Sequence, residues 1–229
     1  MKIHGFQKLT LLDYPGRTAC TLFLAGCDLR CPFCHNSGLL SADAPAETDD
    51  AEVLRYLEMR RALLDGVAIT GGEPLLSPGL PDLLRRIRAL GYDVKLDTNG
   101  THPDRLHAVL EEGLVQYVAM DVKNDLPRYA ETVGIPNFDT TPIRESIRLL
   151  LASPVPCEFR TTAVRELHDE NSFRGIGELI RGAERYYIQC FTDRDTVPVR
   201  GLHAPELADL QAYLRAVEPY VVHAELRGV

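Results

Sequence analysis

Residues 26–36 read Gly26-Cys27-Asp28-Leu29-Arg30-Cys31-Pro32-Phe33-Cys34-His35-Asn36, which places three cysteines in a C-x3-C-x2-C spacing. Thiolates are soft ligands that suit zinc ions and iron–sulfur clusters. Most [4Fe–4S] clusters use four cysteines, so a cluster on Cys27, Cys31 and Cys34 would leave one iron open to an outside ligand. A structural zinc ion on these cysteines and His35 is the alternative. It is disfavoured because Cys34 and His35 are adjacent, and structural zinc sites space their ligand pairs more widely.

The cysteine loop stands near the start of a regular alternation of apolar strands and helices. Continuous apolar runs predict strands, and capping residues such as Asp49, paired with Glu52, and Gly91 mark helix ends. The predicted strands cover residues 19–26, 66–70, 93–98, 115–122, 157–164 and 186–192, with 220–229 as a candidate terminal strand. The predicted helices cover residues 50–64, 80–90, 103–112, 142–152, 170–183 and 205–217.

Strands that alternate with helices predict βαβ units and a mostly parallel sheet. Six units fall short of the eight that close a barrel. We therefore expect an α/β fold, a partial (βα)6 TIM-like barrel, as a single domain of residues 1–229 in which residues 1–18 precede the first barrel strand. A doubly wound open sheet is the alternative. Both folds place the functional site at the C-terminal ends of the strands.

The composition narrows the class of protein. The 229 residues are 45% hydrophobic and 25% charged, and their formal net charge of −8 argues against a nucleic-acid partner. No apolar run approaches the roughly 18 residues that span a membrane, and the N-terminus lacks the apolar stretch of a secretory signal. We therefore expect a cytoplasmic protein with reduced thiols. Cys20, Cys157 and Cys190 fall in predicted strands, where core packing is the expected role.

Further polar or glycine-rich segments end the other predicted strands. They are Gly71-Gly72-Glu73-Pro74, Asp97-Thr98-Asn99-Gly100, Asp121 with Lys123, Arg160 with Thr162, and Gln189–Thr192. By themselves the two glycine-containing segments are also ordinary turn signals. Asp121 and Lys123 share one side of a strand and could equally form a surface ion pair that contributes little to stability. Thr162 could equally be a core residue of its strand.

Taken together, these motifs resemble those of radical S-adenosylmethionine (SAM) enzymes. The C-x3-C-x2-C spacing with Phe33 just before the last cysteine is the signature of that superfamily. Leu12-Asp13-Tyr14-Pro15-Gly16 and Cys34-His35-Asn36 are more similar to the activating enzymes of glycyl radical enzymes. Among these, the chain most resembles the activators of anaerobic ribonucleoside-triphosphate reductase, with pyruvate formate-lyase activating enzyme as a close relative.

The resemblance implies two cofactors, a [4Fe–4S] cluster on the three cysteines and SAM on its open iron. It implies that Phe33, Asn36, Gly71, Gly72 and Glu73 line the SAM site, the GGEP segment beside the SAM amino group. It also implies further roles for strand-end residues: a monovalent cation on Asp97, Thr98 and Asp121; SAM or peptide contact by Lys123; and SAM carboxylate and nucleoside contacts by Arg160 and Thr162. On the sixth strand the SAM-contacting histidine of pyruvate formate-lyase activating enzyme is absent, and Gln189 or Thr192 stands nearest.

The implied activity is reductive cleavage of SAM to a 5′-deoxyadenosyl radical, which takes a hydrogen atom from a glycine of a partner glycyl radical enzyme. The implied partner is anaerobic ribonucleoside-triphosphate reductase, and the implied electron donor is a flavodoxin or ferredoxin. We expect the protein to bind neither nucleic acid nor a membrane. One alternative is a radical SAM reaction on a small molecule, such as a 7-deazaguanine precursor. A non-catalytic iron–sulfur electron carrier is the other, and it would be expected to show four cysteine ligands and no SAM motif.

Overall fold

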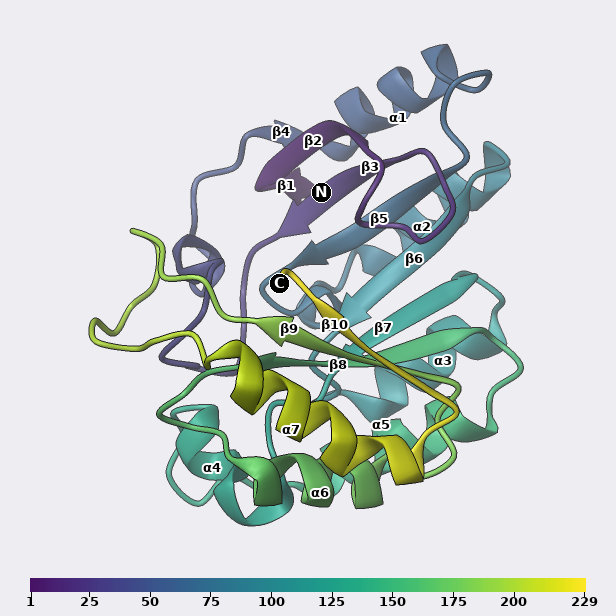
Figure 1. Cartoon of the computed structure of the whole chain (residues 1–229). Coiled ribbons are helices and arrows are strands. Elements are labelled where there is room, and N and C mark those ends of the chain that lie inside the picture. Colours follow the sequence, from purple (N-terminus) through teal and green to yellow (C-terminus); the bar gives the residue numbers. More distant parts are fainter. The chain divides into compact units, whose positions relative to one another are not determined.

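The computed structural model describes residues 1–229, and its main sheet has eight strands in the order β10-β9-β8-β7-β6-β5-β3-β2 (Figure 1). These strands are β2 (Gly5–Thr10), β3 (Ala19–Leu24), β5 (Gly66–Gly71), β6 (Asp93–Thr98), β7 (Tyr117–Asp121), β8 (Cys157–Ala163), β9 (Arg185–Cys190) and β10 (His223–Arg227). β3, β5 and β6 pair in parallel, as do β8, β9 and β10, whereas β2 is antiparallel to β3. β1 (Lys2–Ile3) and β4 (Thr48–Asp49) form a separate antiparallel pair.

Seven α-helices follow or connect these strands. They are α1 (Asp50–Met59), α2 (Leu80–Ala89), α3 (Pro103–Glu111), α4 (Tyr129–Thr132), α5 (Thr141–Ala152), α6 (Glu170–Leu179) and α7 (Leu207–Val217). The longest, α5, has 12 residues, and none of the helices has the length and apolar character required to cross a membrane.

The strand order confirms the predicted α/β fold and its six βα units. Each of β3, β5, β6, β7, β8 and β9 is followed by at least one helix. The order runs from β3 to β10 without reversal, so the sheet lacks the switch point of a doubly wound fold. β2 and β10 have one neighbour each, and the sheet is therefore open, as a partial barrel requires.

Several element ends differ from the sequence-based expectation. α1 ends at Met59 rather than near residue 64, because a tight turn follows in which the Leu64 amide donates to the Arg60 carbonyl. α6 ends at Leu179 rather than 183. The segment before the first barrel strand contributes β2, whose GFQKLT sequence has three consecutive exposed residues and so lacks the apolar run that identifies a buried strand.

The chain divides into two compact units. Unit 1 comprises residues 1–28, 38–98 and 104–118, and unit 2 comprises residues 29–37, 99–103 and 119–229. In unit 1, α2 buries Leu80, Leu83, Leu84 and Ile87, which are spaced as one face of a helix. The basic residues of α2 are not part of this buried face. Asp49 caps α1 by accepting from the Glu52 amide at 2.9 Å, as predicted.

In unit 2, α6 and α7 pack against each other, and α7 also contacts β9 and β10 (Figure 1). The rings of Phe173 on α6 and Tyr213 on α7 stack with centroids 4.5 Å apart. Asp169 and Ser172 form a reciprocal capping box that fixes the start of α6. The capping box therefore fixes the end of the loop that follows β8.

Candidate functional site

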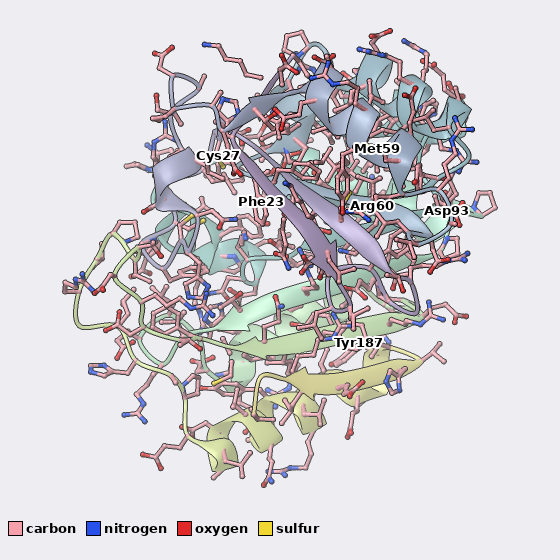
Figure 2. All side chains as sticks on the ribbon, turned by 90° about the horizontal axis from the view of Figure 1, so that it is seen from above. Phe23, Cys27, Met59, Arg60, Asp93 and Tyr187 are labelled. Atoms are coloured by element: carbon pink, nitrogen blue, oxygen red, sulfur yellow. The ribbon has the colours of Figure 1, made fainter.

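The three cysteines of the motif follow β3, and they fall in both units. Cys27 belongs to unit 1, where its amide donates to the Leu40 carbonyl at 3.1 Å. Figure 2 shows Cys27 beyond the C-terminal end of β3, at the opposite end of unit 1 from Asp93, which begins β6. Cys31 and Cys34 belong to unit 2, where the Cys34 amide donates to the Cys31 carbonyl at 3.2 Å. This turn is the structural counterpart of the C-x2-C spacing.

Cys31 is buried and Cys34 is half-buried, and both thiols lie near a cation. Burial raises the pKa of Cys31 to about 11, and the Lys123 ammonium opposes that rise. Burial also raises the pKa of Cys34, again against the influence of Lys123. A soft metal centre binds thiolates, so metal binding here releases protons from these thiols. The nearby ammonium favours the deprotonated form that a metal requires.

Asp121 is held between two cations in unit 2. Its Oδ1 accepts from Arg160 Nε and its Oδ2 from Lys123 Nζ, both at 2.9 Å. All three side chains are less than one third exposed, so this is not the solvent-exposed ion pair considered as an alternative for Asp121 and Lys123. Burial alone would raise the pKa of Asp121, but Arg160 and Lys123 outweigh it and hold that pKa well below its ordinary value. The group carries a formal charge of +1, which suits an anionic ligand.

The backbone of Lys123 is fixed by two side chains that the sequence analysis did not single out. Its amide donates to the Tyr129 hydroxyl at 3.3 Å, and its carbonyl accepts from His168 Nε2 at 2.8 Å. Burial lowers the pKa of His168, which keeps the ring neutral, and its Nδ1 accepts from the Val164 amide. The available signal was a His-Asp pair directly before a predicted helix.

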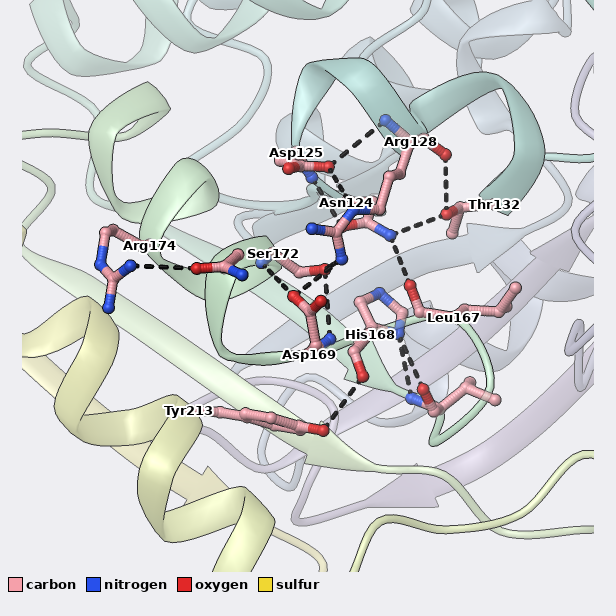
Figure 3. Close-up of polar contacts among 12 residues, drawn as sticks. Asn124, Asp125, Arg128, Thr132, Leu167, His168, Asp169, Ser172, Arg174 and Tyr213 are labelled. Carbon is pink, nitrogen blue, oxygen red and sulfur yellow. Dashed lines mark hydrogen bonds and ion pairs between the residues drawn. The ribbon is translucent and has the colours of Figure 1, made fainter.

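Asn124 extends this network, which Figure 3 shows around Arg128, His168 and Ser172. The Asn124 side chain is fully buried and donates to Thr132 Oγ1 and to the Leu167 carbonyl, each at 2.9 Å. The loop after β7 is therefore tied to the loop after β8. Both loops follow strands that carry candidate site residues, so the network holds Lys123 in place.

Gly71 and Gly72 in unit 1 allow a close approach of two backbone segments. A Cβ at Gly71 would lie 2.2 Å from the Leu24 carbonyl oxygen, and one at Gly72 would lie 2.3 Å from the Gly26 oxygen. Two backbone amides of this segment bond within the protein. The Gly72 amide donates to Leu24 at 2.8 Å and the Glu73 amide donates to Gly26 at 2.7 Å, because the segment packs directly on the end of β3.

Glu73 and Thr98 form a buried pair in unit 1. Glu73 is 0% exposed, and its Oε1 accepts from the Leu75 amide at 3.1 Å and from Thr98 Oγ1 at 2.9 Å. These bonds fix the turn that follows β5. Asp97, the neighbour of Thr98, contacts the ammonium of Lys95 through Oδ1. Lys95 was not predicted, although a lysine two positions before an aspartate in an apolar strand is a readable signal.

The remaining predicted residues lie in unit 2. Phe33 is buried and Asn36 half-buried in the cysteine loop, and Thr162 is half-buried on the same face of β8 as Arg160. Beyond β9, the Thr192 carbonyl accepts from His35 Nε2 at 2.7 Å, and the His35 ring stacks on Phe191. The hydrogen bond and the stacking together fix the orientation of the His35 ring.

Comparison with known proteins agrees with this geometry. The sequence profile of the radical SAM superfamily matches residues 21–172, and the chain belongs to that superfamily. It is therefore a radical SAM enzyme, whose cofactors are a [4Fe–4S] cluster and SAM.

Two proteins are similar to this chain in sequence, and one solved structure is similar to it in fold. A Methanocaldococcus jannaschii protein provisionally named a glycyl-radical enzyme activating enzyme is 29% identical, over 99% of this chain and 96% of its own. A 7-carboxy-7-deazaguanine synthase of Methanopyrus kandleri is 32% identical over 72% of this chain and 70% of its own. The fold resembles Streptococcus suis SuiB bound to its precursor peptide SuiA, with a TM-score of 0.71 and 16% identity over 91% of this chain and 48% of that one.

The described residues fit the two cofactors chemically. Cys31 and Cys34 supply soft donors beside an ammonium that favours their thiolate form. The excess positive charge of Arg160, Asp121 and Lys123 suits a carboxylate such as that of SAM.

Proposed function

We propose that this protein activates a glycyl radical enzyme, most specifically an anaerobic ribonucleoside-triphosphate reductase. The observation that supports this most strongly is the alignment with the Methanocaldococcus jannaschii protein, which spans 99% of this chain. That alignment extends beyond residues 21–172, so it includes Leu12–Gly16, the segment that first suggested an activating enzyme.

In this proposal Cys27, Cys31 and Cys34 would hold the cluster, which would supply the one electron needed for reductive cleavage of SAM to methionine and a 5′-deoxyadenosyl radical. Arg160 binds the SAM carboxylate, supported by its place in a group with excess positive charge. Lys123 favours the thiolates of Cys31 and Cys34.

The other predicted residues shape the rest of the site in this proposal. Glu73 orders the segment beside the SAM amino group through its bonds to Leu75 and Thr98. Phe33, Asn36 and Thr162 line the ligand, and the nearest residues on and just after β9 are Gln189 and Thr192. None of these side chains is required as a general acid or base, because the step is a hydrogen-atom transfer.

The substrate is the Cα–H of a glycine in a folded partner, and the product is 5′-deoxyadenosine together with a glycyl radical. That bond is weak because both flanking amides delocalise the unpaired electron. The partner loop must swing out to reach the site, so we expect weak, transient association. A flavodoxin or ferredoxin is the proposed electron donor.

Electron paramagnetic resonance tests this function directly. The reconstituted protein is mixed anaerobically with SAM, dithionite and an anaerobic ribonucleotide reductase, and we expect a glycyl doublet on the reductase. The matched control is the reductase with its radical glycine changed to alanine, which should give no doublet. A missing doublet on every glycyl radical enzyme tested, with SAM still being cleaved, would contradict the proposal.

A small-molecule reaction is the second candidate, and the 32% identity to the 7-carboxy-7-deazaguanine synthase is the observation that favours it. Formation of 7-carboxy-7-deazaguanine, followed by chromatography and mass spectrometry, distinguishes the two. Catalytic formation of that product without any glycyl radical would favour the synthase activity.

A further inference from the structure

The charges around Asp97 and Asp121 bear on whether the SAM site needs a metal cation. A monovalent cation in a protein is held by carboxylate, carbonyl and hydroxyl oxygens, since hard ions prefer oxygen ligands. Asp97, Thr98 and Asp121 are the residues expected to supply those oxygens. The structure describes what each of the three already contacts within its own unit.

Asp97 already has a protein cation. Lys95 lies two positions earlier on β6, and its ammonium contacts Asp97 Oδ1. The side chain of Lys95 is 3% exposed and that of Asp97 is 16% exposed. Lysine is almost never buried unless it is paired, because an unpaired ammonium loses its hydration. The contact therefore satisfies both charges, and this carboxylate has the counter-charge that a bound cation would provide.

Asp121 has protein cations as well. The Thr98 hydroxyl donates its proton to Glu73 Oε1 at 2.9 Å, which leaves the oxygen able to accept, so the two carboxylates decide whether a metal cation is needed. Asp121 has one cation on each oxygen, Arg160 and Lys123. A third cation added to that group would raise its formal charge from +1 to +2, which Coulomb repulsion in a part-buried setting opposes.

We propose that the Lys95 ammonium takes the place of the monovalent cation, so that this enzyme binds SAM without K⁺ or Na⁺. Lys95 acts through Asp97 and is a positioning residue. An ammonium is a compact point charge with three donors, which makes it a suitable substitute for a simple cation beside a carboxylate. The inference depends on SAM as ligand and not on the identity of the hydrogen donor.

The test compares KCl, NaCl and N-methyl-D-glucamine chloride at equal ionic strength. Thermal unfolding of the metal-free protein and SAM binding to the reconstituted enzyme are the two readouts. A cation that binds the native state raises Tm as its concentration rises. We expect the wild-type protein to give the same Tm and SAM affinity in all three salts. A specific increase with K⁺ or Na⁺ would overturn the inference.

Lys95→Met provides the converse result. Its Asp97 lacks the lysine partner, so we expect K⁺ or Na⁺ to raise its Tm and to increase SAM affinity by about 5- to 150-fold, the usual range for two coupled ligands. A folded Lys95→Met protein without any cation dependence would also overturn the inference. Lys95→Met/Asp97→Asn removes both charges; it should fold and stay insensitive to the salt. A cation dependence in this double variant would place the cation elsewhere and contradict the inference.

Discussion

Replacing Gly71 with alanine should destabilise the protein by removing the space in which two backbone segments meet. Gly71 ends β5 with φ of 126°, and an added Cβ would lie 2.2 Å from the Leu24 carbonyl oxygen and 2.5 Å from its amide nitrogen. Both contacts are with backbone atoms of a paired strand, so neither can move aside like a flexible side chain.

The cost can be estimated from three effects. The left-handed backbone costs alanine about 1–2 kcal/mol, and the reduced entropy of the unfolded chain returns about 0.4–1 kcal/mol. Overpacking adds about 1–3 kcal/mol. The sum is about 1–4.6 kcal/mol, which lowers Tm by roughly 2–18 °C in a protein of this size.

Gly91→Ala is the matched control. Gly91 lies in the same unit with φ of 91°, and its added Cβ would have no neighbour within 4 Å. Only the backbone and entropy effects apply there, so we expect a loss of at most about 1.5 kcal/mol. Urea unfolding of the metal-free proteins measures both. Equal losses for the two variants would refute the close approach described at Gly71.

Three further predictions concern the cysteines and the network behind Lys123. Cys31→Ala should abolish the cluster and SAM cleavage, whereas Cys157→Ala should keep the iron and sulfide content of the wild type; loss of the cluster in Cys157→Ala would contradict the ligand assignment. Burial raises the pKa of Cys31 and of Cys157 to about 11, and that of Cys20 to about 12. The buried protonated thiols therefore add to the free energy of unfolding of the metal-free protein at pH values below the ordinary thiol pKa near 9. This contribution is lost as the pH rises through 11. Melting temperatures that stay constant from about pH 8 to 11 would contradict these shifts. His168→Phe removes the donor to the Lys123 carbonyl and should cost about 1–3 kcal/mol, with partial recovery in His168→Gln as measured by urea unfolding.

The elements that follow from local pattern could be predicted from the sequence. Apolar runs such as residues 66–70 identify strands because a parallel strand is buried on both faces. Gly91 correctly marks the end of α2 because its positive φ suits a glycine after a helix. β2 was missed because most of its residues are not buried, so residues 5–10 lack an apolar run. Its strand conformation depends on pairing with β3, which lies elsewhere in the sequence.

The site was predictable only where a motif fixes residue types by spacing. The cysteines and the polar strand ends could be named, yet their partners could not. Lys95 neutralises Asp97, and Tyr129 and His168 hold the backbone of Lys123. Tyr129 and His168 come from loops or short helices, and their positions depend on tertiary packing rather than on period or propensity.

Transfer of hydrogen from a labelled glycine tests the central claim most directly. An anaerobic ribonucleotide reductase is produced with glycine deuterated at Cα and is incubated with the reconstituted enzyme, unlabelled SAM and dithionite. Mass spectrometry of the 5′-deoxyadenosine then reports the source of the abstracted hydrogen. We predict one deuterium in the 5′-deoxyadenosine, and none when the radical glycine of the reductase is changed to alanine. Unlabelled 5′-deoxyadenosine formed at the same rate with either reductase would contradict the claim that this protein acts on a glycine of a partner enzyme.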